Sequence, residues 1–296
     1  MMLRLVLPKG SLERATMQLF EDADLAVSRG SDVDYRGSID DPRVSEVRIL
    51  RPQEIPRYIA DGLFDVGITG RDWIEERNAE VVTLTELHYS KATARPIRMV
   101  LAVAADSPAQ SVSDLPAGLI VHTEYPEVTR RYFEQHGVDA RVELSYGATE
   151  AKVPDIADAV VEITETGRAL RAAGLRILDT ILVSYTELIA SPAAYADPEK
   201  RKAMEQLQSL LTGALDARGR VLLKLNVDAA DLDGVIALLP ALKSPTVSKL
   251  FGTDPAAPSF AVETVVAKSE INTLIPELLD LGANGIIELP ISKIIP

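Results

Sequence analysis

The sequence predicts an α/β protein with a two-lobed core followed by a smaller C-terminal unit. Two observations carry this prediction. Short apolar segments alternate with segments of good helix formers from Leu3 to Ser191, which is typical of mostly parallel sheets covered by helices. Beyond a charged helical stretch at Pro198–Gly219, the segments follow the order strand, helix, strand, strand, helix, strand. With 296 residues, 47% of them hydrophobic, the chain can build a sizeable core.

The first lobe is predicted from strands that alternate with helices. Leu3–Leu7 is a strand, and Ser11 can cap the helix after it. The polar segment Asp22–Pro42 is expected to be a mobile loop or a short hairpin. Further strands are expected at Val44–Arg51, after Asp65 and at Val81–Leu87, with helices at Pro52–Asp61 and after Gly70.

The second lobe is expected to begin where the chain crosses at Arg95–Pro96. The predicted strands are Ile97–Ala104, Leu119–Thr123, Val138–Tyr146 and Ala159–Ile163, with a helix at Pro126–His136. The β-rich run Arg176–Ser191 is long enough to lead back into the first lobe. Two lobes joined by two crossings form a hinge with a ligand cleft between them, as in periplasmic binding proteins. We therefore expect lobe I at residues 1–96 plus 187–214 and lobe II at residues 97–186.

The C-terminal unit, expected at residues 215–296, has the βαββαβ order of ferredoxin-like folds. Its strands are predicted at 221–227, 246–251, 260–268 and 285–294, and its helices at 228–239 and 269–281. Ser269 is expected to cap the second helix, and Gly282 to end it. The unit has no phosphate-type glycine turn and no obvious catalytic cluster, which favours a regulatory or assembly role.

The stretch from Asp155 to Gly174 predicts a phosphate site. A buried strand is followed by the turn Thr164–Gly167 and by a helix from Arg168. Such a turn points backbone amides and a helix dipole at an anion. Asp158 and Glu162, expected just before the turn, could bind ribose hydroxyls or a phosphate-bound Mg²⁺. The alternative is an ordinary connection with a capping threonine.

Composition excludes several classes of function. The net charge of −13 argues against nucleic acid or an anionic membrane as the partner. Absence of cysteine excludes disulfides, thiolate catalysis and Cys-ligated zinc, and three scattered histidines argue against a His-rich metal site. No apolar run approaches the ~18 residues of a membrane span. Arg4, Pro8 and Lys9 argue against a signal peptide, so a soluble cytoplasmic protein is expected.

Several motifs, taken together in their order and spacing, resemble one enzyme family over essentially the whole chain. They are Leu7–Leu12, Leu50–Pro52, Asp65–Asp72, Thr123–Pro126, Gly147–Glu150, Asp158–Glu162 with Thr166–Gly167, and Ser244–Thr246. The chain resembles the long form of ATP phosphoribosyltransferase, the first enzyme of histidine biosynthesis. Two residues depart from the family pattern: Glu165 stands where Ser is common, and Ala169 where Thr is common. Both lessen hydroxyl contacts to a 5′-phosphate, and Glu165 adds repulsion unless it points away, while Arg168 could compensate.

The resemblance implies that ATP and 5-phosphoribosyl 1-pyrophosphate (PRPP) give N1-phosphoribosyl-ATP and pyrophosphate with Mg²⁺ as cofactor. It also implies histidine as an inhibitor bound by the C-terminal unit, and a homo-oligomer, dimer or hexamer. No protein nucleophile is required, only positioning and charge stabilisation. The implied catalytic residues are Lys9 and Arg51. The implied PRPP-binding residues are Asp158, Glu162, Thr164, Glu165, Thr166, Gly167, Arg168, Ala169 and Leu170. The implied ATP-binding residues are Gly70, Arg71, Asp72, Tyr125, which could stack on adenine, and Glu150. The implied regulatory residues are Ser244, Pro245 and Thr246.

Each assignment has a simpler structural alternative. Lys9 and Arg51 could be surface cations, Tyr125 could pack beside Pro126, and Glu150 could cap a turn. Asp72 could be a helix-start carboxylate. The single tryptophan, Trp73, is predicted to be a core residue rather than a ligand platform.

Two other classes of protein remain open. A two-lobed small-anion binding protein would share the hinge architecture, and a catalytically weak regulatory paralogue would share the motifs. The intact turn at Thr166–Gly167 and the presence of Lys9 disfavour the paralogue. The additional C-terminal unit disfavours the binding protein.

Overall fold

The computed structural model describes residues 2–31, 33–89, 96–240, 244–252 and 256–295. The chain divides into two compact units, Met1–Gln208 and Ser209–Pro296. Within the described residues, no helix is long and apolar enough to cross a membrane. Each unit is described by itself below.

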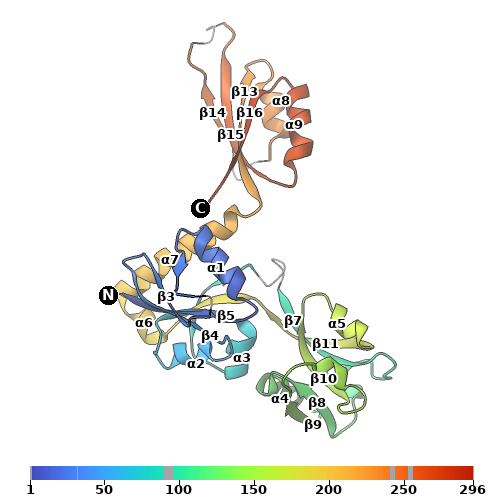
Figure 1. Ribbon diagram of the computed structural model, residues 1–296. Helices are drawn as coiled ribbons and strands as arrows, with labels where there is room; N and C mark the ends of the chain where they lie inside the picture. The colour runs from blue at the N-terminus through green and yellow to red at the C-terminus, as the bar shows by residue number, and fades with distance from the viewer. Residues whose placement is uncertain (1, 32, 90–95, 241–243, 253–255, 296) are drawn as a thin grey trace. The chain divides into compact units, whose positions relative to one another are not determined.

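The first unit contains two sheets, and the first of these has seven strands in the order β2-β3-β4-β1-β5-β12-β6 (Figure 1). Its centre is parallel, since β1 pairs in parallel with both β4 and β5. The strands are β1 (Leu3–Pro8), β2 (Val27–Ser28), β3 (Arg36–Ile39), β4 (Val44–Leu50), β5 (Val66–Gly70), β6 (Val82–Leu87) and β12 (Thr186–Ala190). The helices of this lobe are α1 (Glu13–Asp22), α2 (Ile55–Ala60) and α3 (Arg71–Arg77). The expected hairpin within Asp22–Pro42 is therefore β2–β3.

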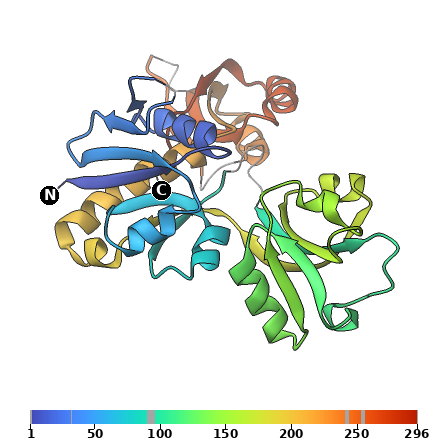
Figure 2. The ribbon, with the colours of Figure 1, turned by 60° about the horizontal axis from the view of Figure 1, so that its bottom comes forward.

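The second sheet of this unit has five strands in the order β11-β7-β10-β8-β9. They are β7 (Ile97–Ala104), β8 (Leu119–Thr123), β9 (Ala140–Leu144), β10 (Ala159–Thr164) and β11 (Leu175–Ser184). The helical segments are η1 (Val112–Asp114), α4 (Pro126–Gln135), η2 (Thr149–Lys152) and α5 (Arg168–Ala172). Only Tyr185 separates β11 from β12, so the chain passes directly from the second sheet into the first (Figure 2). The unit thus has the two-lobed α/β architecture of periplasmic binding proteins.

Both faces of the second sheet are covered by apolar side chains, because alternate residues of each strand point to opposite faces. Val121, Val161 and Leu101 pack with the apolar face of α4. Val160 and Ala102 belong to a second cluster on the other face.

A buried ion network fixes the start of β5 in the first sheet. The carboxylate of Asp65, 2% exposed, accepts hydrogen bonds from the backbone and guanidinium of Arg4 and from the ammonium of Lys200 at 2.9 Å. Lys200 lies in α7 (Pro198–Ala217), which follows the short helix α6 (Pro192–Ala196). Burial alone would raise the pKa of Asp65, but the bonds from Arg4 and Lys200 outweigh it and lower the pKa. The network therefore ties α7 to the strand that leads to Gly70.

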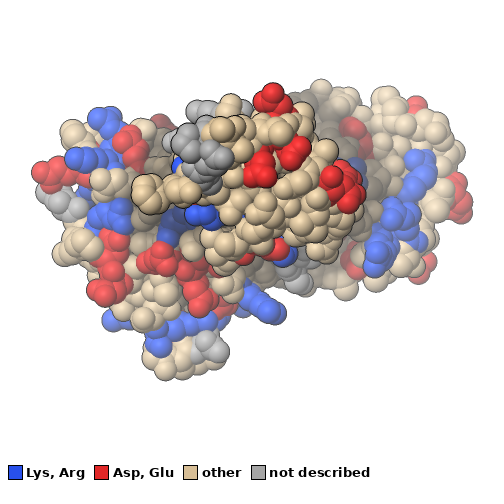
Figure 3. Space-filling view, turned by 90° about the horizontal axis from the view of Figure 1, so that it is seen from above, with Lys and Arg blue, Asp and Glu red and all other residues tan. Residues whose placement is uncertain are grey.

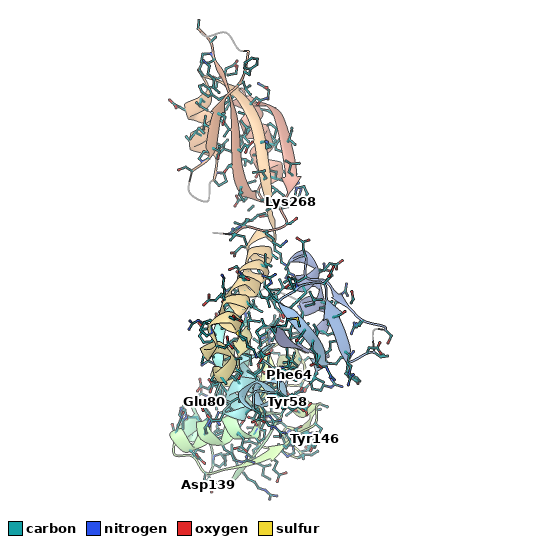
Figure 4. The ribbon with its side chains drawn as sticks, turned by 90° about the vertical axis from the view of Figure 1, so that its left-hand side faces the viewer. Tyr58, Phe64, Glu80, Asp139, Tyr146 and Lys268 are labelled. Atoms are coloured by element: carbon teal, nitrogen blue, oxygen red, sulfur yellow. The ribbon has the colours of Figure 1, made fainter. Side chains whose placement is uncertain are left out.

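The second unit has the ferredoxin-like order β13 α8 β14 β15 α9 β16 with the sheet order β14-β15-β13-β16, all antiparallel (Figure 1). The elements are β13 (Arg220–Asp228), α8 (Leu232–Leu238), β14 (Thr246–Lys249), β15 (Ser259–Ala267), α9 (Ile271–Asp280) and β16 (Asn284–Pro290). Alternate residues of β13, such as Leu223 and Leu225, pack under both helices. Lys268, which follows β15, pairs with Glu288 on β16 (Figure 4).

Helix starts differ from the predicted ones. Helix α1 begins at Glu13 with Leu12 as its N-cap and without a side-chain cap, and the Glu13 carboxylate accepts the Gly10 amide at 3.3 Å. Ser11 is thus not the cap. In α9 the N-cap is Glu270, not Ser269, again without a capping side chain. The division at Gln208 falls six residues before the predicted end of lobe I at residue 214, inside the continuous helix α7. Arg95, at the predicted crossing, lies outside the described residues.

Candidate active site

A cleft of about 320 Å³ lies in the first unit where the two sheets meet. The first sheet and its loops contribute Ser11, Leu12, Pro52, Gly70, Asp72, Trp73 and Tyr89, the second contributes Pro96, Ile97, Ile163, Thr164 and Glu165, and the crossing contributes Ser184, Tyr185 and Thr186. Gly70 and Thr164 are the last residues of β5 and β10. The cleft is therefore built at strand ends, where ligands of open α/β sheets usually bind.

The turn from Gly70 to Asp72 forms one wall of the cleft. Gly70 ends β5 and is the N-cap of α3. A Cβ at Gly70 would lie 2.1 Å from Oδ1 of Asp72, so only glycine fits beside that carboxylate. The Asp72 side chain folds back over the turn, and Asp72 is only 2% exposed.

The Asp72 carboxylate joins the two lobes. Its Oδ2 accepts a hydrogen bond from the hydroxyl of Tyr125 at 2.7 Å, and its Oδ1 accepts one from Ser184 at 2.8 Å. The Ser184 hydroxyl in turn accepts the Asp72 amide at 3.0 Å. Burial raises the pKa of Asp72 and outweighs the two hydroxyl donors, which lower it. A lobe I helix is thus bonded to residues of lobe II through a desolvated carboxyl group.

A second carboxylate of α3 caps a helix of the other lobe. Glu76, 5% exposed, accepts the amides of Glu127 (3.1 Å) and Val128 (3.0 Å) in the first turn of α4. The guanidinium of Arg131 donates to the carbonyl of Glu75. Burial raises the pKa of Glu76 despite the two amide donors, which lower it. Together with Asp72, these contacts hold α3 against lobe II.

The turn that follows β10 borders the opposite side of the cleft. Gly167, the N-cap of α5, has φ +70°, a conformation that favours glycine. The Gly167 amide donates to Oγ1 of Thr164 at 2.8 Å, and the Arg168 amide donates more weakly to Oγ1 of Thr166 at 3.4 Å. The hydroxyls of Thr164 and Thr166 therefore already accept hydrogen bonds from two of the amides that were expected to bind a phosphate.

The first helix start contributes cations. The Lys9 ammonium lies 3.0 Å from Glu13 and 5.9 Å from the ring centre of Tyr35. Gly10, with φ +97°, leaves room for the guanidinium of Arg51, which a Cβ there would approach to 3.3 Å. Although the net charge is −13, basic side chains stand among acidic ones on the face seen in Figure 3. Lys9 and Arg51 thus follow the carboxyl ends of the neighbouring parallel strands β1 and β4, where an anion could be bound. Neither is among the residues that line the cleft.

Comparison with known proteins agrees with this two-lobed cleft. A family model described as ATP phosphoribosyltransferase matches residues 51–213, and a model of the C-terminal domain of the same family matches residues 217–293. ATP phosphoribosyltransferases of Desulforudis audaxviator and Pelotomaculum thermopropionicum are 50% and 48% identical to the chain, each over 100% of both chains.

The chain belongs to the ATP phosphoribosyltransferase family. It is therefore a phosphoribosyltransferase that uses ATP, and it carries the C-terminal domain of the long form. A solved chain of the ATP phosphoribosyl transferase (HisG:HisZ) complex from Thermotoga maritima is similar in structure, with a TM-score of 0.60 and 28% identity. The similarity covers 71% of this chain and 99% of that chain.

Tyr125 and Arg71, for which the family resemblance implies ATP binding, are occupied by other contacts. Tyr125, predicted to stack on adenine, is 1% exposed, and its ring packs against Trp73 with centroids 4.4 Å apart. Arg71 turns toward Glu75 (3.0 Å) and the buried carboxylate of Glu187 (3.4 Å). Burial of Arg71 lowers its pKa, but the carboxylates outweigh this and raise it. The Tyr125 ring is therefore buried, and the Arg71 guanidinium is held by two carboxylates.

Asp158 lies at the end of β10 away from the phosphate turn. Its carboxylate accepts the Ile120 amide at 2.7 Å, and its own amide donates to the Ile120 carbonyl. The six residues of β10 separate it from the turn by about 20 Å, at roughly 3.3 Å per residue. Asp158 is therefore a strand-pairing residue here, which corrects its expected place beside the turn.

Glu162 is placed where the sequence expects it, two residues before the end of β10. Burial raises its pKa, and the neighbouring charges of Glu124 and Glu150 raise it further, against the Ile163 amide and the Thr149 hydroxyl, which lower it. Glu150 lies in η2 within the same acidic group. This group could accept hydrogen bonds from ribose hydroxyls.

The remaining loop residues divide into three kinds. Glu165 is among the residues that line the cleft, and it is half-buried. Arg168 and Ala169 are exposed, whereas the Leu170 side chain is 2% exposed and belongs to the core, so it could contact a ligand only through its backbone.

In the second unit, Ser244 and Pro245 lead into edge strand β14, which begins at Thr246.

Sequence reasoning missed several residues that build the cleft. Trp73, assigned to the core, lines it, as do Ser184 and Tyr185 at the crossing and Ile163 on β10. The run Arg176–Ser191, predicted to lead from one lobe into the other, was a usable signal for Ser184 and Tyr185, because crossing segments border the cleft in two-lobed folds. The pairing of Asp72 with Tyr125, 53 residues later, left no local signal.

Proposed function

We propose that this cleft condenses ATP with PRPP to N1-(5-phosphoribosyl)-ATP and pyrophosphate. The observation that carries the proposal is the meeting of the Gly70–Trp73 turn and the Thr164–Glu165 segment across one cleft, in a chain of the ATP phosphoribosyltransferase family. The lining combines apolar walls with hydroxyl groups at strand ends, which suits a substrate with an aromatic base. Its charged members, Asp72 and Glu165, are acidic, so the phosphates are proposed to be bound by groups outside this lining.

The proposed chemistry needs positioning rather than a protein nucleophile. The lone pair of adenine N1 attacks C1 of the ribose from the face opposite pyrophosphate. The C1–O bond breaks, and its electron pair leaves with the pyrophosphate oxygen. Positive charge develops on the ribose and negative charge on the leaving group, so fixed charges stabilise the transition state. Lys9 and Arg51 are proposed to meet the pyrophosphate, and Lys9 would then exchange its bond to Glu13 for one to the leaving group.

The PRPP loop is proposed to hold the 5′-phosphate. The Gly167 amide is engaged by Thr164, so the phosphate is proposed to use the amides of Ala169 and Leu170 in the first turn of α5, since first-turn amides generally lack an intrahelical acceptor. The exposed Arg168 could add a charge-assisted bond and offset the repulsion from Glu165. Glu162 is proposed to accept the ribose hydroxyls. Gly70 and Glu150 are proposed for ATP, with Asp72 acting through the turn that it closes.

Magnesium is proposed to arrive with the substrates. Across the described ranges, no group of three or more His, Asp or Glu residues stands in a metal-holding arrangement. Mg²⁺ usually needs only one or two carboxylates beside substrate phosphates, so it is proposed to be held mainly by those phosphates. No step of the proposed chemistry is assigned to it.

A pyrophosphate-release assay with ATP and PRPP tests the proposed reaction. The expected result is release that requires both substrates, with N1-phosphoribosyl-ATP identified by mass spectrometry. Release without ATP, or none with both substrates present, would contradict it. The same assay separates this enzyme from a small-anion binding protein and from a weak paralogue.

The PRPP loop needs its own variant. Gly167→Val is a poor choice, because φ +70° strains any side chain and the new Cβ would meet Arg171 at 2.9 Å. Thr166→Ala removes one exposed hydroxyl without that strain. It is expected to weaken PRPP binding while ATP binding stays at the wild-type level, as measured by calorimetry. Unchanged PRPP affinity would remove Thr166 from the phosphate site.

We propose that the chain is organised as three parts: lobe I (1–96 plus 187–214), lobe II (97–186) and a regulatory unit (215–296). The second unit, including Ser244–Thr246, is proposed to bind histidine and to mediate feedback inhibition in a homo-oligomer, dimer or hexamer, in the cytoplasm. Histidine inhibits only if it binds one arrangement of the protein better than another, and the coupling is reciprocal. Calorimetry should show that PRPP changes the affinity for histidine by a certain factor, and that histidine changes the affinity for PRPP by the same factor. Histidine binding that is indifferent to PRPP would contradict the coupling.

A further inference from the structure

The single tryptophan stands at the cleft with one face already occupied. Trp73 is the third residue of α3, is partly exposed and lines the cleft. Its ring packs on Tyr125 at 4.4 Å with an interplanar angle of 32°. Tyr125 cannot move freely, because it is buried and its hydroxyl is bonded to Asp72. The indole is thus supported from behind by a fixed ring.

The surroundings of Trp73 favour a planar apolar ligand. Ile97 and Ile163, from the second sheet, line the same cleft, while the polar groups of Thr164 and Glu165 follow at the end of β10. An indole that remains partly exposed in such a cleft can bury more apolar area against a ligand. Stacking on an aromatic side chain needs a flat ring and little else.

Of the two proposed substrates, only ATP carries an aromatic ring, since PRPP consists of ribose and phosphates. We infer that Trp73 is the wall on which the adenine ring of ATP stacks. The inference rests on the proposed binding of ATP in this cleft and adds the residue that fixes the base. Tyr125 packs on the opposite face of the Trp73 indole and does not itself touch the adenine ring.

This role has a kinetic signature. A stacking contact is made in the bound ground state and is kept in the transition state, so its loss raises KM for ATP and leaves kcat nearly unchanged. Stacking also accepts the face of any purine. Loss of the Trp73 ring should therefore weaken the binding of ATP and of inosine triphosphate by the same factor, because the two nucleotides differ only in groups on the edge of the purine ring.

Three variants of the full chain test the binding role. Trp73→Leu keeps apolar bulk but removes the ring and is expected to weaken ATP binding about tenfold, within the range of base–aromatic stacking. Trp73→Phe keeps a ring and should stay within about threefold of the wild type. Tyr58→Leu is the matched control: Tyr58 is a partly exposed aromatic residue in α2, beside Phe64 and outside the cleft lining (Figure 4). It should bind ATP as the wild type does, with affinities measured by calorimetry.

Trp73 is also its own spectroscopic probe. With one tryptophan in the chain, ATP should quench the wild-type fluorescence with the dissociation constant found by calorimetry. Ribose 5-phosphate and pyrophosphate, which lack a base, should not produce this quenching. Quenching of equal size by the two base-free ligands would assign the signal to lobe movement and overturn the stacking inference.

The outcomes separate the inference from the function beneath it. If ATP gives neither binding heat nor pyrophosphate release, the proposed function fails. If ATP binds and reacts but Trp73→Leu has wild-type affinity and KM, only the inference fails. Because Trp73 also packs against the lobe II core, thermal unfolding is followed for each variant. Should the Leu variant not fold, Trp73→Phe and the wild-type titration decide, and absence of ATP-dependent quenching overturns the inference.

Discussion

Replacing Tyr125 by Phe removes one oxygen from the junction of the two lobes. In the wild type that hydroxyl donates to Oδ2 of Asp72 at 2.7 Å, between residues that are 1% and 2% exposed. The substitution creates no large cavity, because the ring and its packing on Trp73 remain. It leaves one carboxylate oxygen buried without this donor. The free energy of unfolding of the first unit should therefore fall by about 1–3 kcal/mol.

Urea and thermal unfolding of the full chain, followed by Trp73 fluorescence, measure this effect. For a unit of this size, 1–3 kcal/mol lowers Tm by about 2–12 °C. Tyr58→Phe is the control, since its hydroxyl makes an exposed bond to Glu54, and its effect should stay within about 0.5 kcal/mol.

A double-mutant cycle with Asp72→Asn isolates the pair. Once the carboxylate is gone, the added cost of Tyr125→Phe should shrink, giving a coupling energy of at least about 0.5 kcal/mol. Additive effects, or a Tyr125→Phe protein as stable as the wild type, would refute the view that this bond holds the lobes together.

Three further outcomes are expected. Lys9→Ala should lower kcat about 100-fold or more with little change in ATP affinity, whereas wild-type turnover would make Lys9 a surface cation. The folded-state pKa of Glu76 is raised, so this residue stabilises the fold most below its unfolded pKa near 4.5, and the contribution is lost as pH rises through the folded pKa. Unfolding measured across this pH range should show the wild type losing stability relative to Glu76→Gln. The same pH dependence in both proteins would contradict this. Lys200→Met removes one partner of buried Asp65, which keeps its bonds to Arg4, and should cost about 1.5–3 kcal/mol in urea unfolding, with an effect below about 0.5 kcal/mol counting against the network.

Much of the architecture could be predicted because local pattern determines it. Ile97–Ala104 is apolar at every position except Arg98, and it forms β7 with the predicted bounds. The C-terminal alternation gives the predicted βαββαβ order, since Leu223 and Leu225 alternate with polar residues along β13. Helix starts were less predictable: Glu13, through its carboxylate, satisfies the amide of Gly10 and leaves Ser11 to the cleft.

The cleft itself depends on contacts between distant residues. The motifs identified both turns, Gly70–Asp72 and Thr164–Gly167, because glycine and hydroxyl residues interrupt apolar strands there. They did not show that Tyr125 would be buried against Trp73, since no local pattern pairs two aromatic residues from different lobes. Asp158 was expected beside the turn, but it directly precedes β10, so the whole length of the strand separates it from the turn.

The most direct test of the account is the reaction itself, carried out by the full chain with ATP, PRPP and Mg²⁺. The account predicts one pyrophosphate released for each N1-phosphoribosyl-ATP formed, with wild-type rates for Tyr58→Leu and a rate lowered about 100-fold or more for Lys9→Ala. No pyrophosphate from the wild-type protein, or a product joined at an atom other than adenine N1, would contradict it.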